Sequence, residues 1–113
     1  MIQISKTKKG TDKIEYILND VVIGRLYIKQ NGMFCSFRVK NEYTRRGIGS
    51  LILKALIDNF KDRGLFAYAS PKFYDQTLES KEQKRIELIE FYKRNGFKHV
   101  GKSKIIYELS ERN

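Results

Sequence analysis

The spacing of apolar residues changes abruptly near the middle of the chain, and this change limits the folds that the sequence can adopt. Between residues 33 and 40 apolar and polar residues alternate, which predicts a strand with one buried face. The apolar positions are Met33, Cys35, Phe37 and Val39, with Phe34, Ser36, Arg38 and Lys40 between them. A helical stripe then begins, with apolar residues at Ile48, Leu51, Ile52, Ala55, Leu56 and Phe60. The sequence therefore predicts a strand that leads through a short turn into a helix, which Gly64 ends.

Turn signals divide the preceding residues into three further strands. We predict these strands at Ile2 to Thr7, Lys13 to Leu18 and Val21 to Lys29. The last of them is joined to the next strand by Asn31-Gly32, two residues that tolerate the positive φ of a type I′ hairpin turn. The first part of the chain should therefore be a meander of four strands.

The second half of the chain predicts one more helix and three short strands. An apolar run from Leu65 to Ala69 fits a buried strand, and the polar stretch from Pro71 to Glu79 fits a loop. Ser80 and Gln83 have the spacing of a capping box, so we expect a helix from Ser80 to Asn95-Gly96. Its inward residues should be Leu88, Ile89, Phe91 and Tyr92, and two strands should follow at Phe97 to Val100 and Lys104 to Leu109. The fold class is therefore mixed α+β.

Composition excludes several classes of protein. A length of 113 residues suits one core, so we expect residues 1–113 to form a single domain. The formal charge of +10 favours an anionic ligand or partner. One Cys and one His cannot complete a zinc site or an internal disulfide. Because the sequence has no signal peptide and no apolar run that could span a membrane, we expect a cytoplasmic protein without a membrane partner or a metal.

The turn between the fourth strand and the first helix has the composition of a phosphate-binding site. The segment from Val39 to Ser50 contains Gly47, Gly49 and the adjacent Arg45 and Arg46. Free amides at a helix start attract anions, and glycines let a ligand approach the backbone. The third glycine of a dinucleotide-binding loop and the Gly-Lys-Ser/Thr ending of an NTPase loop are both missing. The residues alone leave an alternative open, in which the glycine pair only relieves crowding between strand and helix.

Two motifs in this order resemble the GNAT family of N-acetyltransferases. The first is Thr44-Arg45-Arg46-Gly47-Ile48-Gly49 after a strand, which resembles the family's acetyl-CoA-binding motif. The second is Phe91-Tyr92-Lys93-Arg94-Asn95-Gly96-Phe97 at the end of the following helix. The resemblance implies a central, largely antiparallel sheet of about six or seven strands with two main helices.

The resemblance also implies an activity and its site residues. An amine would attack the thioester of acetyl-CoA directly, and the backbone of Phe37, Arg38 and Val39 would pair with the pantetheine arm. The implied pyrophosphate contacts are Thr44, Arg45, Arg46, Gly47, Ile48, Gly49 and Ser50. Tyr92 matches the general acid that protonates the departing thiolate, and the residue pattern leaves open that it is a packed aromatic like Phe91.

The chain departs from the family pattern at three places. Thr44 stands where an Arg or Gln is usual, and Arg85 where many members carry an Asn. The two lid helices that normally follow the first strand are replaced by a turn at Lys9 to Asp12, so we expect an open acceptor side. We name no general base, because Met33 occupies the place of the usual Glu, although Glu15, Asp75 and Glu79 are candidates. Cys35 and His99 have no evident catalytic partner, so we expect structural roles for both.

These observations favour an acetyl-CoA-dependent N-acetyltransferase that modifies a protein lysine or N-terminus. Three alternatives stay open at this point. The chain could be a basic module that binds nucleic acid without catalysis, a sensor that binds CoA, or a small-amine acetyltransferase whose lid comes from a second copy in a dimer.

Overall fold

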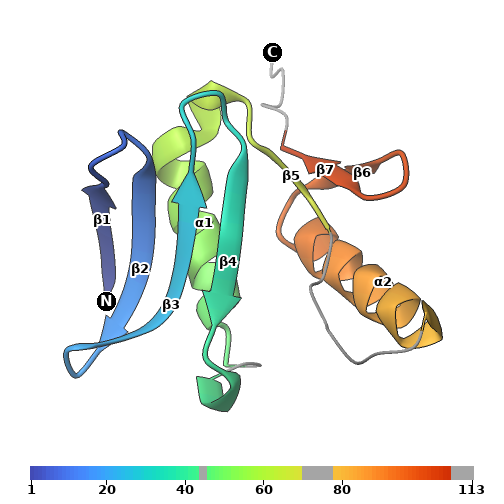
Figure 1. Ribbon diagram of the computed structural model, residues 1–113, viewed down its shortest axis with the longest axis horizontal. Helices are drawn as coiled ribbons and strands as arrows, with labels where there is room; N and C mark the ends of the chain where they lie inside the picture. Colours follow the sequence, from blue (N-terminus) through green and yellow to red (C-terminus); the bar gives the residue numbers. More distant parts are fainter. Residues whose placement is uncertain (44–45, 70–77, 108–113) are drawn as a thin grey trace.

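The first four strands form an antiparallel meander. The computed structural model describes residues 1–43, 46–69 and 78–107. Strands β1 (Ile2–Lys6), β2 (Asp12–Leu18), β3 (Val21–Ile28) and β4 (Phe34–Val39) pair in sequence order (Figure 1). Residues 7–11 form a tight turn between β1 and β2, in which the Thr7 amide donates to the Thr11 carbonyl at 2.7 Å. This turn makes up the whole β1–β2 connection, which therefore contains no lid helices, as we expected.

A second sheet holds the remaining three strands. β5 (Phe66–Tyr68), β7 (Lys104–Ile106) and β6 (Lys98–Val100) pair antiparallel in the order β5-β7-β6. The two sheets meet at a parallel bridge between Met33 and Phe66, and β4 and β5 diverge from this junction (Figure 1). The α+β class is thus confirmed, and each expected strand has a counterpart, with the strands divided between two sheets; residues 108 and 109 of the last expected strand lie outside the described residues.

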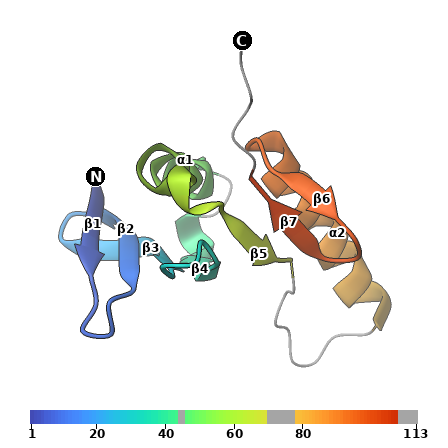
Figure 2. The ribbon, with the colours of Figure 1, turned by 90° about the horizontal axis from the view of Figure 1, so that it is seen from above.

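Two helices complete the described fold. α1 (Ile48–Phe60) follows the short 3-10 turn η1 (Asn41–Tyr43), and a second such turn, η2 (Lys61–Arg63), follows α1. α2 (Leu78–Arg94) begins two residues before Ser80, so the predicted capping box is wrong: Ser80 lies within the first helical turn. α1 packs on one face of the β1–β4 sheet (Figure 2). None of the described helices has the length and apolar character needed to cross a membrane.

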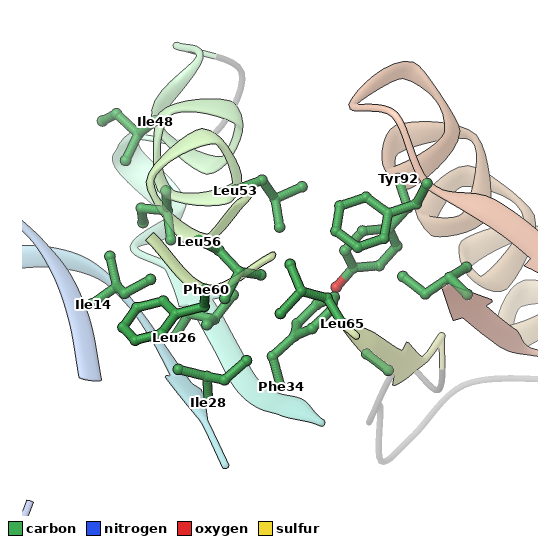
Figure 3. Packing of buried hydrophobic residues seen from close by; sticks show 14 of the residues in the cluster. Ile14, Leu26, Ile28, Phe34, Ile48, Leu53, Leu56, Phe60, Leu65 and Tyr92 are labelled. Atoms are coloured by element: carbon green, nitrogen blue, oxygen red, sulfur yellow. The ribbon is translucent and has the colours of Figure 1, made fainter. Parts of the chain in front are cut away.

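The core lies between α1 and the first sheet and extends to α2 and the second sheet (Figure 3). On α1 the buried residues are Ile48, Ile52, Leu53, Leu56 and Phe60. Leu51, which we predicted on this stripe, is 46% exposed. It lies beside the buried stripe and lines a surface depression with Arg94. Gly24 permits the close approach of sheet and helix, since a Cβ there would lie 2.7 Å from Ile52 Cδ1.

A bulge in β4 changes which of its side chains face the core. Tyr27 pairs with Cys35 and Arg25 with Arg38, so Ser36 and Phe37 together oppose the single residue between Arg25 and Tyr27. Ser36 adopts φ 53° at this bulge. The simple alternation predicted for residues 33–40 is therefore wrong before the bulge: Phe34 is 2% exposed and in the core, and Cys35 is only partly buried.

The turn types also differ from the prediction. Asn31-Gly32 does connect β3 and β4, but Asn31 has no positive φ, and the Gly32 amide donates to the Lys29 carbonyl at 3.0 Å. This is a three-residue loop that ends in a left-handed glycine. The two-residue geometry with positive φ at both positions occurs instead at Asn19 and Asp20.

The junction of the two sheets is held by backbone packing and an ion pair. Gly32 lies against the α1–β5 connection, and its carbonyl accepts a hydrogen bond from the Phe66 amide at 3.0 Å. Beside it, Arg63 Nη1 lies 2.9 Å from Oδ2 of the buried Asp12, in the geometry of an ion pair rather than a hydrogen bond. The Arg63 guanidinium also lies 4.6 Å from the centre of the Phe60 ring. These contacts fix the point from which β4 and β5 diverge.

Candidate active site

The start of α1 presents backbone amides without a side-chain cap. Gly47 is the N-cap residue with φ 79°, and the first helical hydrogen bond runs from the Leu51 amide to the Gly47 carbonyl at 3.0 Å. Amides of the first helical turn have no carbonyl one turn earlier in the helix, and among the described residues no side-chain cap substitutes for one. Apart from Gly47 and its immediate chain neighbours, no described atom lies within 4 Å of the place of a Gly47 Cβ. A negatively charged group could therefore approach this helix end closely.

The second glycine of the pair has a different role. A Cβ at Gly49 would lie 3.1 Å from Cζ of Phe91 and 3.6 Å from Cζ of Phe37. Gly49 therefore lets α2 and β4 pack tightly against the first turn of α1. The crowding interpretation applies to Gly49, and the open approach to the backbone applies to Gly47.

A cleft of about 480 Å³ opens at this helix start. Its walls come from β4, the first turn of α1 and the C-terminal half of α2, through Phe37, Val39, Gly47, Gly49, Ser50, Leu88, Phe91, Arg94 and Asn95. Arg94 and the positive end of the α1 dipole give the cleft a cationic character. An apolar wall of aromatic rings lies opposite, where Phe37 and Phe91 pack at 6.2 Å between ring centres.

The structure brings together half of the residues that the sequence predicted for a cofactor. Phe37, Val39, Gly47, Gly49 and Ser50 line the cleft. The Arg38 side chain is exposed in the cross-strand row with Arg25, away from the α1 side of the sheet, and the Ile48 side chain is buried in the core, so neither is among the lining residues. The Arg46 guanidinium lies 5.4 Å from the centre of the Tyr43 ring, and Arg46 does not line the cleft. Thr44 and Arg45 lie outside the described residues.

Sequence reasoning missed four lining residues on α2 and at its end. These are Leu88, Phe91, Arg94 and Asn95. Arg94 and Asn95 belong to the motif around Tyr92, so the motif carried a signal for them, but their approach to α1 depends on the contact between Gly49 and Phe91.

Tyr92 lies in the aromatic core, packed against Phe37 and Phe91 of the cleft wall, and is not itself one of the lining residues. Its ring centre is 5.5 Å from that of Phe91, 6.4 Å from that of Phe37 and 5.9 Å from that of Phe34. The residue is 5% exposed, and Figure 3 shows it between α2 and the core residues of the first sheet. Burial raises the pKa of the Tyr92 phenol above its ordinary value of 10.0, so the hydroxyl keeps its proton at neutral pH.

The other candidates for chemistry have partners elsewhere. His99 Nε2 is 3.1 Å from the Lys102 carbonyl in the β6–β7 turn, and Arg85 bonds to Glu82 and to the same carbonyl. Glu15 is paired with Lys13 at 3.6 Å. Asp75 and the side chain of Glu79 lie outside the described residues. Across the described parts of the chain, no group of three or more His, Cys, Asp or Glu side chains could hold a metal ion.

The model of the acetyltransferase (GNAT) domain family matches residues 12–99. The chain belongs to the GNAT family. The matched range runs from β2 to β6 and includes all the residues that line the cleft. This GNAT protein is therefore an acetyltransferase, and the family's cosubstrate is acetyl-CoA.

Solved structures show the same fold for this GNAT domain at low sequence identity. Escherichia coli ElaA superposes with a TM-score of 0.62 at 15% identity, over 88% of this chain and 69% of ElaA. Tetrahymena GCN5 superposes with a TM-score of 0.58 at 15% identity, over 86% of this chain and 67% of GCN5. None of the curated proteins compared with the chain matches it.

Proposed function

We propose that this GNAT domain transfers the acetyl group of acetyl-CoA to an amine of a protein, either a lysine or the N-terminus. The observation that carries the proposal is the combination of the cleft at the α1 start with a β4 strand that no lid helix from the β1–β2 connection covers. We further propose that residues 1–113 act as one domain.

The residues of the cleft fit the chemistry of acetyl-CoA. The uncapped amides after Gly47 suit a pyrophosphate, and the Arg94 guanidinium adds a positive charge at the same cleft. β4 is the last strand of its sheet, so beyond the Met33–Phe66 bridge one edge of its backbone is free to pair with the amides of a pantetheine arm. When bound, acetyl-CoA supplies a thioester carbonyl for the amine to attack.

Tyr92 is the residue that we assign to proton transfer. In the overall reaction the amine nitrogen forms a bond to the acetyl carbon, the carbon–sulfur bond breaks, and the amine loses a proton to solvent. The Tyr92 hydroxyl would donate a proton to the leaving sulfur and recover one from water. Its raised pKa keeps the hydroxyl protonated, and the contact of its ring with Phe37, a residue of the cleft wall, supports this assignment.

A protein acceptor is favoured by the shape of the molecule. The short β1–β2 turn leaves the sheet face opposite α1 uncovered by any described helix (Figure 2), so a broad surface can approach β4 from that side. A small amine would find no enclosing wall on that face of the described chain. Its binding would need a second copy to supply one.

A thermal-shift measurement tests the cosubstrate site. Acetyl-CoA at about 100 times its Kd should stabilise the chain by about 2.7 kcal/mol. Gly47→Glu should abolish this stabilisation, because a carboxylate at the helix start repels phosphate. The control is Gly101→Glu, since Gly101 also has a positive φ and open space around it but lies in the β6–β7 turn. A Gly47→Glu variant that is stabilised as much as the control would show that the site is misplaced.

Intact-protein mass spectrometry tests the acceptor class. The enzyme and acetyl-CoA are incubated with a cell lysate depleted of small molecules and, separately, with a panel of polyamines, aminoglycosides and free amino acids. We expect acetylated proteins in the lysate and no saturable turnover of the small amines. The opposite pattern would refute a protein acceptor and favour the dimeric small-amine enzyme.

A further inference from the structure

The β1–β4 sheet has one face that α1 covers and one that no described element covers (Figure 2). We call the second one the open face. Residues directly opposite each other in an antiparallel pair share a face, so the register places Glu15, Arg25 and Arg38 in one row across β2, β3 and β4. The neighbouring row contains Tyr27 and Cys35. Gly24, the neighbour of Arg25, faces Ile52 of α1, which confirms that Arg25 points the other way.

The open face carries a pair of like charges in direct cross-strand register. Arg25 and Arg38 are partners in the β3–β4 ladder and both are exposed. Like charges at such a position destabilise a sheet. Glu15, the other neighbour of Arg25, is already paired with Lys13 at 3.6 Å. Strand alternation adds Lys40 to the same face, and within the described ranges neither Arg38 nor Lys40 has an ion-pair partner.

The three cations surround a depression next to the proposed acetyl-CoA site. Arg25, Arg38 and Lys40 line a cavity of about 420 Å³ formed by the beginning of β3 and the end of β4. Val39 lines both this cavity and the cleft at the α1 start. An occupant of the cavity would therefore lie beside the strand that we propose to hold the pantetheine arm. Tyr27 extends the patch, with the Arg25 guanidinium 5.8 Å from the centre of its ring.

We propose that this part of the open face binds an acidic segment of the acceptor protein, adjacent to the amine that is acetylated. The proposal rests on the proposed function, because it assumes a protein acceptor. Guanidinium groups pair with carboxylates through two parallel hydrogen bonds, and two adjacent arginines fit two neighbouring Asp or Glu side chains. Neighbouring Asp or Glu side chains on the acceptor would also reduce the repulsion between Arg25 and Arg38.

The size of the patch favours a short acidic segment over a nucleic acid. Nucleic-acid binding commonly uses about 6–10 phosphate contacts along a cationic track. Here the patch has three cations without a carboxylate partner, and the row that contains Arg25 continues to the carboxylate of Glu15. A long polyanion that crossed the open face would meet this negative charge.

The test compares peptides that differ only in the residues beside one lysine. One peptide carries Asp and Glu on both sides of the lysine, and its partner carries Asn and Gln. We expect kcat/KM and the affinity in fluorescence anisotropy to favour the acidic peptide by about tenfold or more, as one charge-assisted hydrogen bond would give. The preference should weaken as salt rises. Arg25→Gln combined with Lys40→Gln should remove the preference and leave the neutral peptide's kcat/KM unchanged.

A matched double variant separates local docking from long-range charge. Lys9→Gln with Lys61→Gln removes the same charge from exposed positions outside the patch and should keep the preference. An equal loss in this control, or equal anisotropy affinities for the two peptides, would overturn the proposal. So would tighter binding of a single-stranded RNA of equal charge. If acetyl-CoA binds but no peptide is acetylated, the protein-acceptor function fails, and the anisotropy comparison still decides the docking proposal.

Discussion

Replacement of Gly32 by alanine should destabilise the protein far more than the same replacement at Gly10. Both glycines have a left-handed backbone, with φ of 98° and 82°. A Cβ at Gly32 would lie 2.3 Å from the Gly64 carbonyl oxygen and 2.6 Å from that of Arg63, whereas a Cβ at Gly10 would have no neighbour within 4 Å. The comparison therefore separates steric overlap at the sheet junction from the conformational cost of alanine.

The two costs can be set side by side. A left-handed conformation costs an L-residue about 1–2 kcal/mol, and both variants carry this loss. Overlap with backbone atoms adds about 1–3 kcal/mol at Gly32, and displacement of the Phe66-to-Gly32 hydrogen bond adds about 1 kcal/mol. We therefore expect Gly32→Ala to lose at least about 2 kcal/mol more than Gly10→Ala.

Urea denaturation followed by circular dichroism measures this difference. A gap of about 2 kcal/mol corresponds to a Tm difference of about 8 °C or more in a domain of this size. Equal losses in the two variants would mean that the two sheets do not depend on close packing at Gly32, and the account of the junction would fail.

Three further predictions concern the ion pair at the junction and the buried phenol. Arg63→Ala should cost about 3 kcal/mol in urea denaturation, because it leaves the buried Asp12 carboxylate without its nearest cation, whereas Lys54→Ala, in the exposed pair with Asp58, should stay within about 1 kcal/mol. Similar losses of stability in the two variants would show that the junction pair contributes no more than an exposed ion pair. Burial raises the pKa of Tyr92, so above pH 10 the folded protein keeps the phenol proton while the unfolded chain releases it. The free energy of unfolding should therefore fall above pH 10 by about 1.4 kcal/mol per pH unit. Tyr92→Phe should lack this contribution to the slope. The same variant should slow turnover by about 10²-fold or more when chemistry limits the rate, while Tyr107→Phe should not, and an unchanged rate would leave Tyr92 a packing residue.

Local patterns in the sequence predicted most of the helices and strands but not the details that depend on how one element pairs or packs with another. The amphipathic stripe located α1, and the apolar run after Gly64 located β5. The bulge at Ser36 could not be predicted, because it depends on the register of β4 against β3, and this register puts Phe34 in the core in place of Cys35.

The candidate site likewise contains residues that a local motif predicted and residues whose place depends on packing. Gly47, Gly49 and Ser50 were found from a contiguous motif, since a helix start is a local feature of the sequence. Leu88 of α2 was missed as a lining residue, because its place depends on how α2 packs against α1. Arg38 was assigned to the cosubstrate through its backbone, which stays a prediction, and its side chain lies on the exposed polar face that the alternation of residues 33–40 indicated.

The open face has a consequence for how the protein behaves in solution. Two uncovered sheets can stack face to face at about 10 Å when their surfaces are apolar, and this stacking leads to association and precipitation. The Lys13–Glu15 pair and the two arginines in register are charged side chains that keep this face hydrated. The positive charges of the arginines also make two such faces repel each other. The like charges of Arg25 and Arg38 thus also allow a GNAT domain to lack covering helices on this face without aggregating.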